Sequence, residues 1–318
     1  LTWERTQEFN IGLDFGFFRN RINGSLDVYQ RTSKDLIMER QLPSTTGWTS
    51  VWDNIGKVRN TGLELSINTI NVQTSDFSWQ TNIIFDTNKN EILELYGGKK
   101  DDIGNKWFIG EAINVNYDYE FDGIWQTSEA DKAAIYGQTP GQVKVKDQNH
   151  DNVIDAKDKV ILGQQLPKWT GSITNTFTYK NWDLAFNVYT RQGAQLNSTF
   201  VSSFMAYDGN YNQAKVDYWT ETNPTNKYPQ PGNKGKYFSS MCYQDVSFVR
   251  VGYITLGYTF PMSLLKPIGI KRLKLYATAN NPFLFTSFKG FDPEWATQNT
   301  WGEATSTRTF LFGVKLAF

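Results

Sequence analysis

The stretch that decides the fold is EFNIGLDFGFFRNRINGSLDVYQR, which runs from Glu8 to Arg31. In residues 11–17 every second side chain is apolar, and residues 22–28 repeat the alternation after the polar pair Arg19-Asn20. Successive side chains of a strand point to opposite faces, so each run has one apolar and one polar face. Two such runs around a short turn predict a β-hairpin. Both runs are long enough to cross a lipid bilayer at a tilt.

Further runs show the same alternation and predict an all-β protein. They lie at residues 60–71, 77–95, 169–179, 182–190, 246–260, 270–285 and 309–318. Strands of a transmembrane antiparallel β-barrel alternate in this way between lipid and lumen. The runs give about nine crossings, an odd number, whereas bacterial single-chain barrels have an even number of strands. We therefore expect the chain to form part of a large barrel.

The connections between the runs are of two kinds, short turns and long polar stretches. Short turns are expected at Arg19-Asn20, residues 71–76, Lys180-Asn181 and residues 261–269, and long stretches at residues 41–58, 96–167 and 192–244. Outer-membrane barrels have short periplasmic turns and long extracellular loops. The strands alternate in direction only if residues 96–167 form one extracellular excursion without a further crossing.

Residues 147–158, inside that excursion, have the ligand spacing of an EF-hand-type calcium loop. Position 6 of the loop is Asn152 instead of glycine, although asparagine tolerates the left-handed conformation. Asp158 replaces the usual glutamate at position 12, and its shorter side chain predicts weaker binding. The alternative interpretation is a solvated Asp/Asn turn. The predicted ligands of a structural calcium ion are the side chains of Asp147, Asn149, Asp151, Asp155 and Asp158 and the backbone carbonyl of Val153.

The composition narrows the classes of function. The 318 residues carry 32 basic and 32 acidic side chains, so no net charge attracts nucleic acid. A single cysteine, Cys242, excludes a disulfide within the chain and a Cys-pair metal site. The single histidine, His150, excludes a zinc site built from several histidines and makes a Ser-His-Asp triad improbable. No pair of carboxylates stands out for glycoside hydrolysis, so we predict no catalytic residue and no enzyme.

Several blocks resemble one family. They are Asn54-Ile55-Gly56-Lys57-Val58-Arg59-Asn60, Phe121-Asp122-Gly123-Ile124-Trp125, the calcium-type loop, Gly290-Phe291-Asp292-Pro293-Glu294 and the final Phe318. Together they are similar to the mid-to-late barrel of the SusC/RagA family of TonB-linked outer-membrane proteins. The resemblance covers nearly the whole chain. It implies that residues 1–318 are the C-terminal portion of a TonB-dependent receptor β-barrel in the outer membrane.

The resemblance also implies a function. Family members import oligosaccharides or peptides, a SusD-like surface lipoprotein caps the barrel, and TonB supplies energy through an N-terminal region. We expect that region, with the signal peptide, plug and early strands, to lie outside this sequence, since Leu1-Thr2-Trp3-Glu4 has the character of mid-protein sequence.

The alternative from another class is a soluble extracellular β protein that binds glycans with the help of calcium. It predicts shorter strands than those expected here. Aromatic side chains in the loops are candidates for stacking on sugar rings, or for packing the loops, docking a lid protein or forming an interfacial girdle. These side chains are Trp48, Trp52, Trp107, Tyr207, Tyr211, Trp219 and Trp295.

Overall fold

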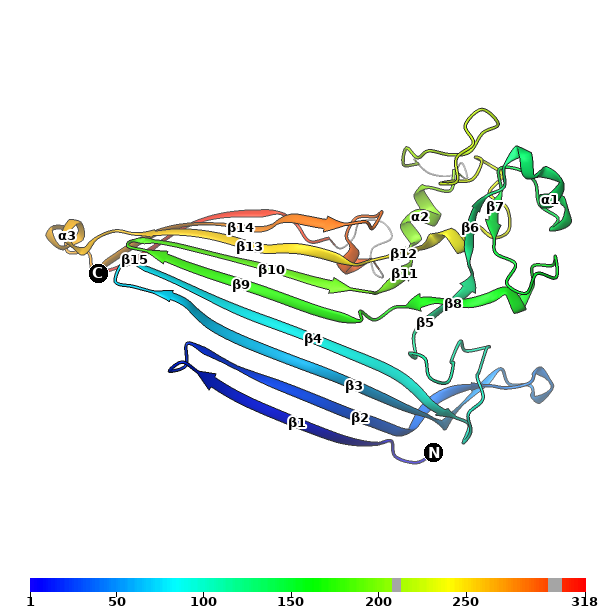
Figure 1. The fold of residues 1–318 in the computed structure, drawn as a ribbon, viewed down its shortest axis with the longest axis horizontal. Coiled ribbons are helices and arrows are strands. Elements are labelled where there is room, and N and C mark those ends of the chain that lie inside the picture. The colour runs from blue at the N-terminus through cyan, green and yellow to red at the C-terminus, as the bar shows by residue number, and fades with distance from the viewer. Residues whose placement is uncertain (208–212, 297–304) are drawn as a thin grey trace.

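The computed structural model describes residues 1–207, 213–296 and 305–318. Its main element is a sheet of nine antiparallel strands in the order β1-β2-β3-β4-β9-β10-β13-β14-β15. Within the described residues β1 and β15 pair on one side only, so the sheet is an open wall (Figure 1). The strands are β1 (Arg5–Phe17), β2 (Ile22–Gln41), β3 (Ser50–Gln73), β4 (Phe77–Leu95), β9 (Trp169–Tyr179), β10 (Trp182–Gln192), β13 (Phe248–Thr259), β14 (Arg272–Thr286) and β15 (Thr309–Ala317).

The register gives the sheet two chemically different faces. One cross-strand row joins residues that are all apolar, and we call this side the apolar face. On the opposite side, Asn82 donates to Asn68 at 2.9 Å, and Asn187 donates to Thr174 at 2.9 Å. We call this side the polar face. The apolar row consists of Phe177, Leu184, Leu256, Ala277 and Phe312, and the polar row of Asn23, Asn68, Asn82, Thr174 and Asn187.

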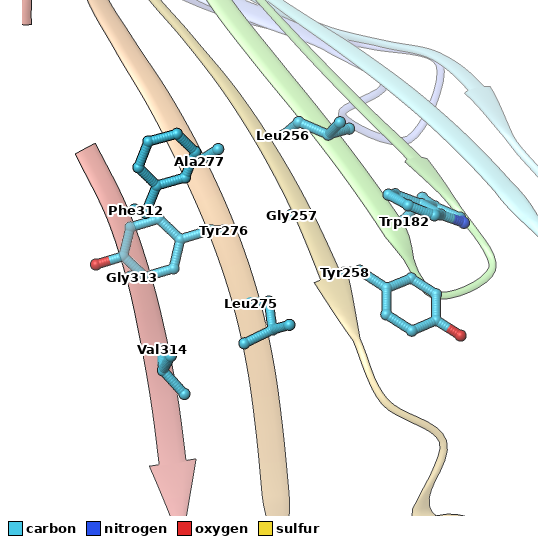
Figure 2. Close-up of a pocket in the computed structure, with 10 residues that line it drawn as sticks. All are labelled: Trp182, Leu256, Gly257, Tyr258, Leu275, Tyr276, Ala277, Phe312, Gly313 and Val314. Carbon is cyan, nitrogen blue, oxygen red and sulfur yellow. The ribbon is translucent and has the colours of Figure 1, made fainter. Parts of the chain in front are cut away.

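The apolar face is widely exposed. Figure 2 shows part of it, where β10, β13, β14 and β15 lie side by side. A shallow hollow of about 540 Å³ lies there between Trp182, Tyr258 and Val314. Nearby on β15 the side chain of Phe312 is 82% exposed. Chains that live in water rarely expose apolar patches of this extent. The face therefore needs an apolar surrounding.

The two ends of the sheet differ as expected. Short turns, and one connection holding α3 (Met262–Leu265) and the 3-10 helix η5 (Lys266–Ile268), lie at one end (Figure 1). Long connections lie at the other end. The nine expected runs are confirmed as the nine strands of the sheet. The interpretation of residues 41–58 as a loop is wrong for most of that range, because β2 and β3 pair outward as far as Gln41 and Ser50. The single turn η1 (Ser44–Thr46) lies in the remaining connection.

The long connections at residues 96–168, 193–207 and 213–247 fold together, and we call them the loop subdomain. They contain no further strand of the main sheet, which confirms that residues 96–167 add no crossing. Their helices are η2 (Thr127–Glu129), α1 (Ala130–Ile135), η3 (Ala156–Asp158), α2 (Thr199–Phe204) and η4 (Phe238–Cys242). Their two-stranded sheets pair β5 (Val115–Tyr119) with β8 (Lys159–Gln164), β6 (Phe121–Ile124) with β7 (Val143–Val145), and β11 (Gln195–Asn197) with β12 (Tyr243–Asp245).

The larger hydrophobic core lies in the loop subdomain. A smaller one lies where Val58, Ile92 and Leu95 of the wall are buried against the first connection. Ile124 and Val143 from the first connection are fully buried in the larger core against Trp219, Phe238 and Cys242 from the second. Burial of this kind supplies about 1.5–3 kcal/mol for each large apolar side chain. The two connections are therefore one folded unit. Among the described residues no helix is long and apolar enough to span a bilayer.

Candidate calcium loop

The predicted calcium loop connects β7 to β8 at the edge of the loop subdomain. Its two ends are buried: Asp147 is 9% exposed and Asp158 is fully enclosed. Asn149 and Asp151 lie at the exposed rim. His150 is also exposed, which agrees with its interpretation as a solvated loop side chain.

Asp147 organises the first half of the loop. Its carboxylate accepts hydrogen bonds from the backbone N–H groups of His150 at 2.7 Å and Asn152 at 2.9 Å, and from the Tyr136 hydroxyl at 3.1 Å. Burial alone would raise the pKa of this carboxyl. The hydrogen bonds donated to it together lower the pKa by more than burial raises it, so the pKa lies below its ordinary value. Asp147 is therefore an anion at neutral pH.

The backbone makes the tight turn that the sequence predicts. Asn152 has φ of 65° and His150 has φ of 61°, so both residues are left-handed. Asparagine occupies this conformation more readily than most residues, which explains how the loop forms without glycine at position 6.

Asp158 closes the second half of the loop. Its carboxylate accepts from the backbone N–H of Gln148 at 2.9 Å and of Asp155 at 2.8 Å. Asp155 in turn accepts from the backbone N–H of Lys157 at 2.7 Å and caps η3. Asp158 thus ties the start of the loop to its end.

The donor set suits a hard cation in kind. It offers four carboxylates, one amide oxygen and one backbone carbonyl, which are the ligands that Ca²⁺ prefers. A carboxylate that accepts two N–H groups keeps lone pairs for a metal ion. However, the described residues contain no group of three or more His, Cys, Asp or Glu side chains close enough to hold a metal. Asn149 donates to Asp151 at 2.9 Å, so these rim ligands are turned toward each other.

The loop is attached to the core of the loop subdomain. The Tyr237 hydroxyl lies 3.4 Å from the carbonyl oxygen of Ile154, and the Ile154 side chain packs against the core. Tyr237 also makes an edge contact with Tyr119, with ring centroids 5.1 Å apart. Order in the calcium loop and order in the second long connection are therefore linked.

The loop aromatics divide between the core and the surface. Trp219 is 3% exposed and its indole N–H donates to Gln126, so it packs the core. Trp48 and Trp52, on the outermost part of the β2–β3 hairpin, are 74% and 60% exposed. Tyr211 lies outside the described residues.

Sequence reasoning missed the partner of Arg250, a residue of β13 that is 2% exposed. Its guanidinium lies 2.6 Å from the carboxylate of Asp292, which is itself 3% exposed. The signal was present in the Gly290–Glu294 block, which the sequence showed as a motif without a role.

A comparison with known proteins assigns the family. Residues 1–282 match the family of TonB dependent receptor-like β-barrels. The chain belongs to this family of outer-membrane β-barrel proteins, and its relatives place it with SusC and RagA.

The similar proteins are all much longer than this chain. It is 31% identical to TonB-dependent receptor SusC of Bacteroides thetaiotaomicron, over 100% of this chain and 32% of that protein. It is 32% identical to TonB-dependent receptor P26 of Formosa agariphila, over 92% of this chain and 31% of that protein. The solved RagAB peptide transporter matches with a TM-score of 0.79 and 26% identity, over 100% of this chain and 36% of the matched chain. The chain spans about a third of the length of these relatives.

Proposed function

We propose that this chain is the C-terminal barrel portion of a TonB-dependent importer that carries oligosaccharides or peptides across the outer membrane. The observation that carries the proposal is the two-faced sheet with a folded subdomain at its loop end. The apolar face meets outer-membrane lipid, the polar face lines the lumen, and the loop subdomain lies on the extracellular side. The similarity to SusC and to the RagAB peptide transporter supports this arrangement.

The loop subdomain is also the surface on which a SusD-like lipoprotein would sit as a lid. Its own core supports this proposal, because it holds the two long connections together as one folded unit. The energy would come from the TonB complex through an N-terminal region. The soluble glycan-binding alternative predicts shorter strands, whereas β3 has 24 residues and β4 has 19. The exposed apolar face of the sheet also speaks against this alternative.

The test uses the full-length protein in its own cells. Cells lacking it are grown on single glycans and on defined peptide mixtures, and are then complemented with the intact gene or with a version lacking the TonB-interacting region. We expect a growth defect on one substrate class that only the intact gene repairs. Equal growth on every substrate, or repair by both versions, would refute the import function.

We further propose that residues 147–158 bind one structural calcium ion. The ligands are Asp147, Asn149, Asp151, Asp155, Asp158 and the Val153 carbonyl. A bound ion would add order to the rim of the loop, where the protein supplies few contacts of its own.

The test of the calcium ion is protease sensitivity with and without a chelator. Lys146 and Lys159 flank the loop and are sites for trypsin. We expect chelator to speed cleavage in the parent protein and to have no effect on the Asp147→Ala, Asp151→Ala double variant, whose barrel stays folded. The matched control is Asp131→Ala on α1, an exposed acidic residue that is not among the proposed ligands and whose replacement removes no lysine or arginine. Identical cleavage of the parent with and without chelator would overturn the proposal.

A further inference from the structure

The segment at residues 289–294 follows β14 and contacts two separate parts of the molecule. Arg250 is the key to its position. In the register Arg250 lies opposite Tyr189, and Tyr189 lies opposite Ser172, all on the polar face of the sheet. The Arg250 side chain is nevertheless 2% exposed, because Asp292 covers it. The segment therefore folds over the polar face of the wall.

The contacts with the wall are charged and largely buried. Asp292 lies 2.6 Å from the Arg250 guanidinium. Glu294 accepts a hydrogen bond from the Tyr189 hydroxyl at 2.9 Å and pairs with Arg191 at 3.3 Å. Two acidic and two basic side chains thus face one another, and charge-assisted contacts of this kind are the strong ones.

Asp292 also shapes the segment itself. Its carboxylate accepts from the backbone N–H groups of Glu294 at 3.0 Å and Ser306 at 2.9 Å. The first bond caps the short 3-10 helix η6 (Pro293–Trp295), and the second holds the returning chain before β15. One side chain therefore fixes both the fold of the segment and its place on the wall.

The same segment contacts the loop subdomain on its other side. The Phe291 ring meets the rings of Phe200 and Phe204 on α2 edge-on, with centroids 5.0 Å and 6.5 Å away. The ammonium group of Lys289 lies 3.1 Å from the hydroxyl of Tyr228, a core residue. The backbone of Lys289 exchanges two hydrogen bonds with the side chain of Gln244.

Two neighbouring residues of this short segment thus contact different parts of the molecule. Phe291 contacts the loop subdomain, and Asp292 contacts the wall. We propose that residues 289–294 are a connector that fixes the loop subdomain to the polar face of the barrel wall, with Arg250 as its positioning residue. Within the segment the two sets of contacts act in series, because Phe291 and Asp292 are neighbours in the chain. The loop subdomain also meets the wall elsewhere, for example where the Ile113 N–H donates to Asn90. This inference goes beyond the transport function and does not depend on it.

The test is hydrogen–deuterium exchange of α2 in the full-length protein in membranes. One variant, Phe291→Ala, removes the aromatic contact between the connector and α2. A second, Arg250→Met with Asp292→Asn, removes the buried ion pair between the connector and the wall without leaving a lone buried charge. A third combines all three substitutions. The matched control is Arg31→Met, which removes a polar-face ion pair with Glu8 at 2.8 Å in which both side chains are partly exposed.

We expect the amides of residues 199–204 to exchange about three- to tenfold faster in either of the first two variants. This range corresponds to the free energy of one aromatic contact. The combined variant should exchange no faster than the quicker of the two, because the loss of either set of contacts already removes the connection through this segment. The control should match the parent. An unchanged rate in α2 in either of the first two variants, or a combined effect equal to the product of the two, would overturn the connector.

If the wall-side variant fails to assemble, Phe291→Ala decides the matter alone, and an unchanged α2 overturns the proposal. The conservative Phe291→Leu should restore slow exchange.

Discussion

Asp158 should set the stability of the calcium loop even when no metal is bound. Its enclosed carboxylate accepts two backbone hydrogen bonds, from Gln148 at 2.9 Å and Asp155 at 2.8 Å. A hydrogen bond to a charged group contributes about 1.5–3 kcal/mol. We take the lower end for each bond, since water reaches the freed N–H groups once the loop opens. Asp158→Ala should therefore destabilise the closed loop by about 3 kcal/mol.

The assay is hydrogen exchange of residues 147–158 in excess chelator, so that only the protein's own bonds count. A loss of about 3 kcal/mol corresponds to roughly a hundredfold rise in the open population. Asp158→Asn keeps one acceptor oxygen and should lose about half of that free energy, which gives roughly a tenfold rise. The control is Lys157→Ala, whose side chain is 72% exposed and which should stay within about 0.5 kcal/mol of the parent. Exchange that is no faster in Asp158→Ala than in the control would refute the reasoning.

Three further predictions concern Asp147, Cys242 and the two faces of β13. The pKa of Asp147 is lowered in the folded state, so the ionised carboxylate stabilises the loop fully above the ordinary carboxyl pKa of about 4. This stabilisation is lost as the pH falls through the pKa of the folded state. Hydrogen exchange measured against pH should show the loop opening only below about pH 4, and opening at neutral pH would contradict the prediction. Burial raises the pKa of the Cys242 thiol to about 12. Iodoacetamide at neutral pH should therefore label this thiol only after denaturation. Rapid labelling of the folded protein would contradict the burial of Cys242 in the core. On β13, Ile254→Arg should lower the free energy of unfolding by about 2–4 kcal/mol, because the apolar face meets lipid. Thr255→Arg on the polar face should lower it by at most about 1 kcal/mol. Urea unfolding in lipid measures both, and equal losses would count against the assignment of faces.

Much of the wall was predictable from local sequence. The alternation in residues 8–31 predicts a hairpin, and the structure pairs Phe15 with Gly24 and Leu13 with Leu26 across it. The prediction succeeds because alternation in a strand is a property of each segment by itself. It fails at residues 41–58, where β2 and β3 continue to pair beyond the expected membrane span. Proline and glycine at positions 43, 47 and 56 favour a loop, and only the cross-strand partner shows that most of the stretch is paired.

The candidate calcium loop was also predictable in its local features. Its spacing, its left-handed Asn152 and its acidic ends lie within one stretch of twelve positions, from Asp147 to Asp158. The burial of Asp158 was not predictable, because it depends on chain packed around the loop from elsewhere.

The sequence by itself determined the strands, their two faces and the ligand spacing, since each of these depends on residues close together in the chain. Only the tertiary structure decided that two long connections share one core, joining Val143 to Trp219 and Phe238. It also decided that Arg250 meets Asp292, 42 residues away. The physical reason is that burial and ion pairing depend on distance in space, and closing such long loops leaves no periodic mark in the sequence.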